Sequence, residues 1–341
     1  MEDQKKMPVS KKPRPKVAST RSSKAASPPA LPDRRVMESF LSAITGRGGD
    51  TATAKAQDVM YDAWEQTTSR SRIALARKAL GISPLCADAY VLLAEEAARS
   101  IEEARDYYAK GVEAGELALG PEGFKDYAGH FWGFLETRPY MRARAGLAAA
   151  LMKLGDVEGA VAHYRDMLRL NPNDNQGIRY LLAAHLLRQG DEAALQELLT
   201  SYEDEGSATW LYTQALLAFR QDGASPQAVK LVKEALASNE HVPAILAGTK
   251  PRVPPQGDYI TMGGPDEATY YITECGPAWH QTPGAVEWLA ALATTPKPNG
   301  RPPRRSIDAC TWRAATRSTL CMWRRTAQYS ARELYKSHYY G

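Results

Sequence analysis

The sequence predicts an all-α protein built from a repeated pair of helices. Across residues 55–292, apolar residues recur three and four positions apart, which is typical of amphipathic helices. Glycine, aspartate and Asn-Pro signals interrupt this pattern at intervals that fit two helices per repeat. The two ends of the chain, residues 1–35 and 295–341, lack the pattern, and we expect both to be disordered tails.

The clearest repeat spans residues 142–172. Leu147 and Leu151 share one face of its first helix. Gly155 can adopt the left-handed conformation that ends this helix, and Asp156 can cap the next one. An apolar stripe on the second helix then leads to an Asn-Pro helix stop. The stripe and the stop consist of Ala160, Tyr164, Met167, Asn171 and Pro172.

Small residues, Ala148 and Ala160, stand where the two helices must cross closely. Together with the large residues, the glycine and the proline, they match the spacing of the tetratricopeptide repeat, which is about 34 residues long. An ordinary helical hairpin would explain the apolar faces but not this combined spacing. Because such units stack on their neighbours, we predict a right-handed superhelical solenoid of tetratricopeptide-type helix pairs with a concave surface. Weaker copies of the pattern occupy residues 73–84, 87–112, 180–199 and 210–236.

The net charge of +4 conceals three different regions. Residues 1–35 carry ten basic and three acidic residues, and residues 295–341 carry ten basic and two acidic residues. The segment between them has a net charge of −11. This acidic body argues against phosphate binding by the folded part of the chain, so nucleic acid could be bound through the tails only.

Both tails have alternative interpretations. The basic run at residues 11–16 could bind an anionic surface or act as a nuclear address. Arginine and tryptophan after residue 295 could contact phosphates and stack on bases. Solvated, disordered segments explain the tails more simply, and a shifted reading frame is a further explanation of the last one. Nucleic-acid association through the tails is therefore an alternative function.

The sequence offers little that indicates an enzyme. The four cysteines have no metal-ligand spacing, which predicts a reducing compartment without disulfides or a zinc site. With no apolar run long enough to span a membrane and no secretory signal, we expect a cytoplasmic protein. No nucleotide-binding, metalloprotease or hydrolase motif occurs, so we expect no catalytic residues, no cofactor and no metal.

One catalytic alternative remains, an enzyme with a site near residues 258–281. Cys275 could act there as a nucleophile with His280 as its base. The two residues are close in sequence, but sequence proximity alone is weak support for a catalytic pair. The run Cys275-Gly276-Pro277 is more simply interpreted as the end of a helix, because proline disrupts helix interiors.

The densest cluster of polar and aromatic residues, residues 129–142, leads into the clearest repeat. Pro139 suits the first turn of a helix, and Thr137 could cap it. We predict that this cluster lines the concave groove and binds a peptide carboxylate or phosphate, since tryptophan and arginine are frequent interface anchors. The predicted binding residues are His130, Trp132, Glu136, Arg138, Tyr140 and Arg142.

A structural interpretation of the same cluster is also open. Trp132 and Tyr140 could pack beneath the loop, because large aromatic side chains favour burial. Glu136 and Arg138 could then pair with each other at the surface. In that case the cluster would shape a loop and leave no group for a ligand.

A second candidate lies at residues 171–180, where polar side chains precede a helix. Asn175 and Arg179 could receive the backbone or carboxylate of a bound peptide. Turn and cap formation by asparagine and aspartate is the simpler interpretation. Arg142 and Arg179 supply only fragments of the Lys, Arg and Asn set with which some repeats grip a terminal carboxylate, so we do not predict that clamp.

Five short blocks carry a further pattern, and they are residues 87–96, 101–104, 110–116, 239–243 and 264–268. These blocks, which include His241-Val242-Pro243, resemble the suppressor-of-tumorigenicity-seven-like family of tetratricopeptide proteins. The resemblance covers about residues 55–292. It implies a helical array followed by a short segment after the His-Val-Pro motif, and an interaction scaffold without catalytic residues. Eukaryotic members look membrane-associated through apolar spans, which this sequence lacks.

These observations together predict the role of the chain. We expect a protein–protein interaction scaffold that binds a peptide or protein partner on the concave face of a helical repeat array. Nucleic-acid association through the basic tails is the first alternative, and an enzyme with a site near residues 258–281 is the second.

Overall fold

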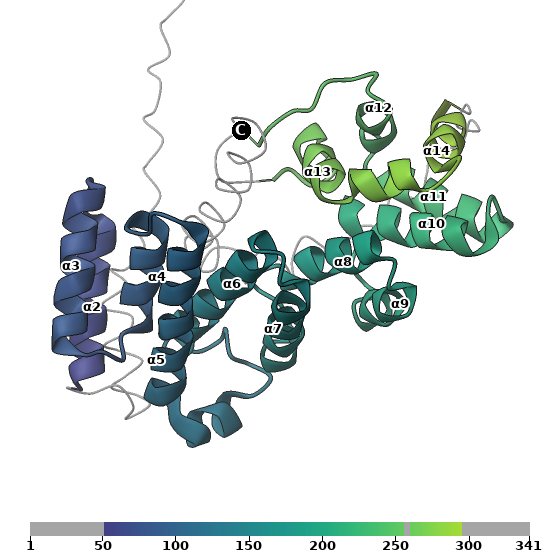
Figure 1. The fold of residues 1–341 in the computed structure, drawn as a ribbon. Helices are drawn as coiled ribbons and strands as arrows, with labels where there is room; N and C mark the ends of the chain where they lie inside the picture. Colours follow the sequence, from purple (N-terminus) through teal and green to yellow (C-terminus); the bar gives the residue numbers. More distant parts are fainter. Residues whose placement is uncertain (1–50, 256–259, 295–341) are drawn as a thin grey trace, which may run out of the picture. The chain divides into compact units, whose positions relative to one another are not determined.

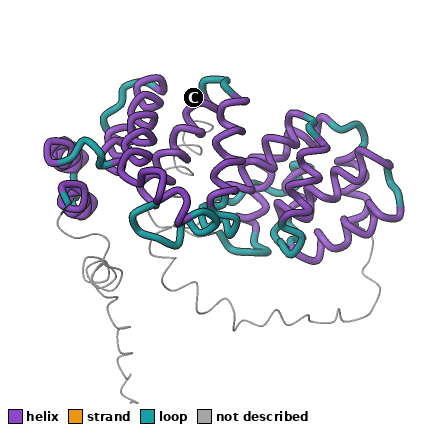
Figure 2. Tube along the Cα trace, turned by 90° about the horizontal axis from the view of Figure 1, so that it is seen from below, coloured by secondary structure: helices purple, strands orange, loops and turns teal. Residues whose placement is uncertain are grey.

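The structure, a computed structural model, describes residues 51–255 and 260–294. These residues form thirteen helices and no strand (Figure 1, Figure 2). The predicted all-α class is therefore confirmed for this part of the chain. The predicted tails at residues 1–35 and 295–341 lie outside the described residues.

The helices agree with the predicted pairs. The segments predicted at residues 87–112, 142–172, 180–199 and 210–236 each contain two helices, and the segment at 73–84 lies within one. The helices are α2 (Ala52–Glu65), α3 (Ser69–Ile82), α4 (Ala87–Glu96), α5 (Ile101–Tyr127), α6 (Arg138–Lys153), α7 (Val157–Leu170), α8 (Ile178–Gln189), α9 (Glu192–Ser201), α10 (Ala208–Asp222), α11 (Pro226–Ser238), α12 (Val242–Leu246), α13 (Pro265–Gln281) and α14 (Ala285–Thr294).

In two of the helix pairs, α6–α7 and α8–α9, the turn between the helices is built from a left-handed glycine and a capping aspartate. Gly155 has a φ of +84° after α6, and the carboxylate of Asp156 accepts a hydrogen bond from the backbone N–H of Gly159 (3.0 Å) at the start of α7. Gly190 (φ +72°) and Asp191 repeat this arrangement between α8 and α9. The local signals read from the sequence are confirmed here.

Thr137 acts differently from the expectation at the start of α6. It occupies the cap position, but its side chain accepts no hydrogen bond from the first turn. Its hydroxyl instead donates to the backbone carbonyl oxygens of Phe131 and Phe134. Thr137 therefore folds the preceding loop back on itself, while Pro139 stands in the first turn of α6 as predicted.

The helix end predicted at Cys275-Gly276-Pro277 is wrong. Helix α13 continues through Pro277 to Gln281. Cys275, Ala278 and Trp279 are all fully buried on its inner side. Burial of these side chains outweighs the one backbone hydrogen bond that Pro277 removes from the helix.

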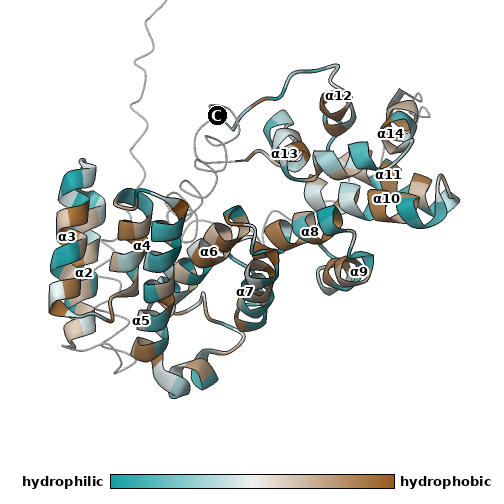
Figure 3. Cartoon of the chain, viewed as in Figure 1, coloured by the Kyte–Doolittle hydropathy of each residue, from teal (hydrophilic) through white to brown (hydrophobic). Residues whose placement is uncertain are grey.

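Consecutive helices pack on one another from α2 to α11 and again from α12 to α14. The two helices of each pair are in contact, and the first helices also meet in two groups, α2 with α4 and α4 with α6, and α8 with α10. Apolar and polar residues are mixed along the helices (Figure 3), which is the pattern of elements that bury one side. None of the described helices combines the length and apolar character that a bilayer crossing requires.

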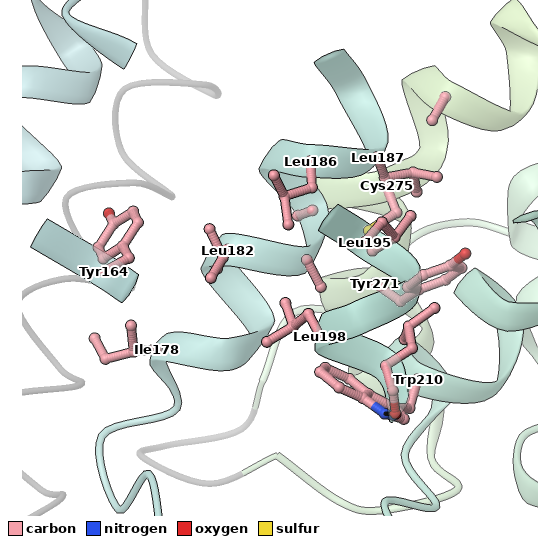
Figure 4. Packing of buried hydrophobic residues seen from close by; sticks show 14 of the residues in the cluster. Tyr164, Ile178, Leu182, Leu186, Leu187, Leu195, Leu198, Trp210, Tyr271 and Cys275 are labelled. Atoms are coloured by element: carbon pink, nitrogen blue, oxygen red, sulfur yellow. Dashed lines mark hydrogen bonds between the residues drawn. The ribbon is translucent and has the colours of Figure 1, made fainter. Parts of the chain in front are cut away.

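Two apolar clusters form the interior, and α4 contributes to both. Leu92 and Leu93 of α4 belong to the cluster with α2 and α3, whereas Val91 belongs to the cluster that continues to α14. Figure 4 shows part of the larger cluster, with labelled side chains from α7, α8, α9, α10 and α13. Helix α13 is thus part of the core even though it follows the last predicted pair.

Helix α13 packs on the first helices of the last two pairs, α8 and α10. The ring of Tyr212 on α10 lies 5.7 Å from that of Tyr271 and 6.5 Å from that of Trp279. The Arg220 guanidinium donates to the hydroxyl of Thr282 (2.9 Å) and to the carbonyl oxygen of Ala278 (3.2 Å). The segment after the His-Val-Pro motif therefore turns back onto the helix pairs.

Candidate functional site

Two loops form the candidate site, one between α5 and α6 and the other between α7 and α8. The backbone N–H of Phe131 donates to the carbonyl oxygen of Leu170 (3.2 Å). The backbone N–H of Trp132 donates to the side-chain oxygen of Asn171 (3.4 Å). All four residues are buried, so these hydrogen bonds fix the two loops to each other at the edge of the core.

A pocket of about 220 Å³ lies between the two loops. Four of the eight side chains predicted to bind a partner line this pocket. Three of them, His130, Trp132 and Arg138, come from the first predicted segment, and Asn175 comes from the second. None of the lining residues carries a carboxylate. The lining residues are His130, Trp132, Gly133, Arg138, Asn171, Asn173 and Asn175.

Trp132 and Arg138 form one wall of the pocket. The guanidinium carbon of Arg138 lies 5.6 Å from the centre of the Trp132 ring, within the range of a cation–π interaction. Arg138 Nε also donates to the carbonyl oxygen of Trp132 (2.9 Å). Trp132 is 3% exposed, and its indole N–H has no hydrogen-bond partner among the described residues. A buried donor without a partner costs roughly 1–3 kcal/mol.

The three asparagines form the opposite wall and differ in burial. Asn171 is buried, and its amide donates to the side-chain oxygen of Asn175 (3.3 Å). Asn175 is half-buried, and Asn173 is exposed. Each amide offers both a donor and an acceptor, so this wall can adapt to the groups it meets.

Asp174 holds the asparagine loop in place. Its φ of +45° is the one positive value at a non-glycine residue within the described ranges. Its carboxylate accepts hydrogen bonds from the backbone N–H groups of Ile178 (2.8 Å) and Arg179 (2.9 Å). Burial raises the pKa of Asp174 to about 6, although these N–H groups and the Arg179 guanidinium act to lower it. The expected turn and cap chemistry is present at this residue.

Glu136 and Tyr140 lie outside the pocket lining. Glu136 does not pair with Arg138 in any hydrogen bond of the structure, and its carboxylate accepts one from the Tyr127 hydroxyl (2.7 Å). Tyr140 is 1% exposed, and its hydroxyl oxygen accepts a hydrogen bond from Arg144 (2.6 Å). Trp132 and Tyr140 thus both pack beneath the loop, as the structural interpretation required.

Arg142 is engaged inside the protein. Its guanidinium forms two hydrogen bonds with the Asp88 carboxylate, at 2.8 and 2.5 Å, and both side chains are buried. The guanidinium carbon also lies 5.6 Å from the centre of the Trp64 ring. Gln57 donates to the same carboxylate (2.8 Å). Arg142 therefore links α2, α4 and α6 instead of lining the pocket.

Arg179 belongs to a second internal network. It donates to the carboxylates of Asp174 (3.1 Å) and Glu205 (2.5 Å) and to the hydroxyl of Tyr180 (2.8 Å). Its guanidinium also lies 4.4 Å from the centre of the Tyr180 ring and 5.3 Å from that of Tyr202. The predicted site is thereby divided. Its loop residues converge on the pocket, whereas Arg142 and Arg179 bind other side chains of the protein.

The structure does not bring Cys275 and His280 together. Five positions on a helix correspond to about 140° around its axis. Cys275 is fully buried, whereas His280 is exposed. Burial raises the pKa of the Cys275 thiol to about 12, so the thiolate needed for nucleophilic attack does not form at neutral pH. Within the described ranges, no group of three metal-ligating side chains is placed to hold an ion.

Sequence reasoning missed the part that Gly133, Asn171 and Asn173 play in the pocket. The alternation of asparagines at residues 171, 173 and 175 was the available signal, since it suggests one polar surface on a turn. A second pocket, of about 510 Å³, lies between α3 and α4 and was also missed. Glu96 lines it, and one carboxylate oxygen of Glu96 is bound by Arg72 (2.5 Å).

Comparison with known proteins gives consistent matches over the helical region. The family model described as ST7 protein matches residues 48–298. A protein ST7 homolog from Drosophila pseudoobscura pseudoobscura is 30% identical over 257 residues, which are 68% of this chain and 47% of the relative. A suppressor of tumorigenicity 7 protein-like protein from Danio rerio is 31% identical over 267 residues, which are 71% of this chain and 45% of the relative.

A more distant match has the same extent. A protein ST7 homolog from Caenorhabditis elegans is 26% identical over 277 residues, which are 69% of this chain and 50% of the relative. The chain spans about half the length of the curated relatives it matches. Because the family model covers well over half of the sequence and the relatives align over the same helices, the chain belongs to the ST7 protein family.

Proposed function

We propose that this chain is a protein-interaction module that binds a peptide segment of a partner in the pocket between the α5–α6 and α7–α8 loops. The observation that carries the proposal is the convergence of His130, Trp132, Arg138 and Asn175 on one pocket. These residues come from loops that are distant in sequence, and buried hydrogen bonds fix them in place. A rigid, preorganised set of polar and aromatic groups is what peptide recognition needs.

The proposal includes the finer assignment of the fold. The helix pairs are of the tetratricopeptide type and stack as a solenoid. In support, the α6–α7 and α8–α9 pairs each have a left-handed glycine followed by a capping aspartate, and the first helices meet in the order α2, α4 and α6 and again between α8 and α10. The small residues Ala148 and Ala160 are fully buried, consistent with a close crossing of α6 and α7.

The proposed binding surface is narrower than the whole concave face expected from the sequence. Helix α13 packs on α8 and α10, so α13 already covers part of the surface of these two first helices. Tyr140, Arg142 and Arg179 are committed to internal contacts. We therefore assign these three residues a structural role and place recognition in the loop pocket.

A peptide-display selection on the full-length chain tests this function. Peptides that bind the wild-type protein are measured by fluorescence anisotropy against Arg138→Ala and Asn173→Ala. Each substitution should weaken binding about tenfold, because it removes a donor from the pocket. Arg165→Ala is the matched control, since Arg165 is exposed on α7 and does not line the pocket.

The result that overturns the function is equally specific. If every selected peptide binds both pocket variants as tightly as the wild type, peptide recognition does not occur at this pocket. Thermal unfolding of each variant separates a lost contact from a lost fold, because Asn173 is exposed and its replacement leaves the loop hydrogen bonds of Asn171 and Asp174 intact.

A further inference from the structure

We propose that the pocket between α3 and α4, called the α3–α4 pocket below, binds an acidic helical segment of a partner protein. This pocket of about 510 Å³ shares no lining residue with the loop pocket, so the inference does not rest on the proposed function. Acidic side chains of the segment pair with Arg70 and Arg77, and a hydrogen-bond donor between them meets Glu96. The lining includes Arg70, Ile73, Ala74, Arg77, Glu96 and Ala97.

Two arginines of α3 supply the positive charge of the pocket. Arg70 and Arg77 are exposed, and neither side chain makes an ion pair or a hydrogen bond within the described ranges. They are seven positions apart, which is about two helical turns, so they face the same side of α3 at a spacing of about 10.5 Å along its axis. A guanidinium group matches the two oxygens of a carboxylate.

Helix α3 is a basic element in an acidic body. It contains four basic side chains and no acidic one, whereas residues 36–294 as a whole have a net charge of −11. That overall charge repels a polyanion such as nucleic acid over long distances, which favours a ligand with few negative charges. Residues 1–35 and 295–341 are both basic, so neither end of this chain supplies the acidic ligand.

Glu96 provides an independent observation. Its side chain lines the pocket and is 7% exposed, and its Oε2 atom is buried without a hydrogen-bond partner among the described residues. A carboxylate oxygen is an acceptor, so the missing partner is a donor, and an unpaired buried acceptor is costly. Arg72 binds the other oxygen (2.5 Å) and stands between Arg70 and Arg77 in sequence. The donor of the ligand therefore belongs between its two acidic groups.

A helix lying along α3 meets these requirements. On such a helix, residues seven positions apart share one face and have the same spacing of about 10.5 Å as the two arginines. A residue three or four positions after the first acidic one lies between them on that face. Ile73, Ala74 and Ala97 give the pocket an apolar surface on which the partner helix can pack.

Fluorescence anisotropy with the full-length chain tests the inference. The probe is a blocked, labelled, alanine-rich helical peptide with two glutamates seven positions apart and a glutamine between them. A matched neutral peptide has glutamine in place of both glutamates. In 0.15 M salt, the acidic peptide should bind about tenfold more tightly than the neutral one. Because both ends of the chain are basic and attract an acidic peptide, the pocket is judged by comparing variants.

Charge variants on α3 locate the binding. Arg70→Glu combined with Arg77→Glu should weaken binding of the acidic peptide about tenfold, because both contacts become repulsive. Lys78→Glu is the matched control, since Lys78 is exposed on the same helix but does not line the pocket, and its effect should stay below about twofold. All three side chains are exposed, and thermal unfolding verifies that the variants remain folded.

A double-variant cycle tests the contact with Glu96. Leucine in place of the central glutamine of the peptide should weaken binding to the wild-type protein about fivefold, because it removes the donor. In Glu96→Met, which lacks the acceptor, the same change in the peptide should have no effect. A role of Glu96 in the fold alone would leave the two penalties equal. The peptide change on the wild-type protein keeps the test valid if Glu96→Met does not fold.

Four outcomes overturn the inference: equal binding of the acidic and neutral peptides, no loss in the arginine variant, an equal loss in Lys78→Glu, or no penalty for the central leucine on the wild-type protein. Sedimentation velocity of the chain alone tests another occupant. A dimer that dissociates when Arg70 and Arg77 are replaced would assign the pocket to a second copy and overturn the assignment to a partner. Tighter arginine-dependent binding of a thymidine oligonucleotide would overturn it in favour of nucleic acid.

Discussion

The first helices of this protein are tied together in two different ways. Helices α2, α4 and α6 meet at the buried carboxylate of Asp88, which binds Gln57 and Arg142. Helices α8 and α10 are instead covered by α13, whose Tyr271 and Trp279 rings contact the ring of Tyr212 on α10. A directional polar contact thus joins the first helices in one region, and a broad aromatic contact joins helices in the other.

This difference teaches where stability and where specificity originate. A buried ion pair fixes the register of the helices, but the cost of removing both charges from water offsets most of its attraction. Buried aromatic rings have no such cost and add stability in proportion to the area they remove from water. A stability loss caused by removing Asp88 should therefore be recovered by a second substitution that removes the charge of Arg142. A loss caused by removing a buried ring of α13 should have no such remedy.

The largest effect is expected at Trp279. Its side chain is fully buried, and its indole N–H donates to the Tyr271 hydroxyl (2.7 Å). Trp279→Ala should lower the free energy of unfolding by about 4 kcal/mol, because it leaves a cavity and an unsatisfied hydroxyl. Chemical denaturation measures this loss. Trp288→Ala is the control, since the half-buried Trp288 of α14 should lose clearly less, and equal losses would contradict the role given to α13.

A smaller loss of stability, which a second substitution should recover, is expected at the Asp88–Arg142 pair. Asp88→Ala should lower the free energy of unfolding by about 3 kcal/mol, because Arg142 keeps a buried charge without its partner. The double variant Asp88→Leu with Arg142→Met should recover most of that loss, since no buried charge remains. Denaturation of the three proteins forms the test. A double variant no more stable than Asp88→Ala would show that the pair itself stabilises the fold.

Lowering the pH should reduce the free energy of unfolding through His185, which belongs to the second region. Burial, together with the nearby Arg188, lowers the pKa of His185 on α8 to about 4. The unfolded histidine titrates near 6.5, so the unfolded state takes up the proton first and stability falls as the pH drops from 6.5 toward 4. At pH 5 the loss should be about 2 kcal/mol. Denaturation at pH 8 and pH 5 should show this loss in the wild type and not in His185→Gln, and equal pH dependence would argue against a buried neutral His185.

The smallest effects should be identical in the two regions. Asp156 caps α7 through the N–H of Gly159 (3.0 Å), and Asp191 caps α9 through the N–H of Ala194 (3.1 Å). Each replacement by alanine should lower the free energy of unfolding by about 1 kcal/mol, since both carboxylates make the same exposed contact. Thermal denaturation of the two variants side by side measures the difference. Unequal losses would mean that the surrounding packing affects even these local contacts.

The features predicted well from the sequence are local. Gly155, Asp156 and Asn171-Pro172 determine their own turn and helix ends within a few residues, so their pattern is sufficient. The helix pairs follow from the apolar spacing in the same way. Pro277 shows the limit, because its local preference for ending a helix is overcome by the burial of Trp279, which depends on helices far away in the sequence.

The candidate site was predictable only in part for the same reason. His130, Trp132 and Arg138 belong to one segment, and their composition identified it. That Asn173 and Asn175 would join them depends on the hydrogen bond between Trp132 and Asn171, 39 positions apart. The Asp88–Arg142 pair spans 54 positions. No spacing rule connects residues at such separations, so Arg142 could not be recognised from sequence as an internal residue.

The return of α13 onto α8 and α10 decides how this protein can be dissected. A fragment that ends with the last helix pair, at Ser238, would uncover Tyr212 and leave the Arg220 guanidinium without the Thr282 and Ala278 oxygens that it binds. Such a fragment would self-associate through the uncovered rings. The shortest piece that carries the whole of the larger apolar cluster must extend at least through Leu289 of α14.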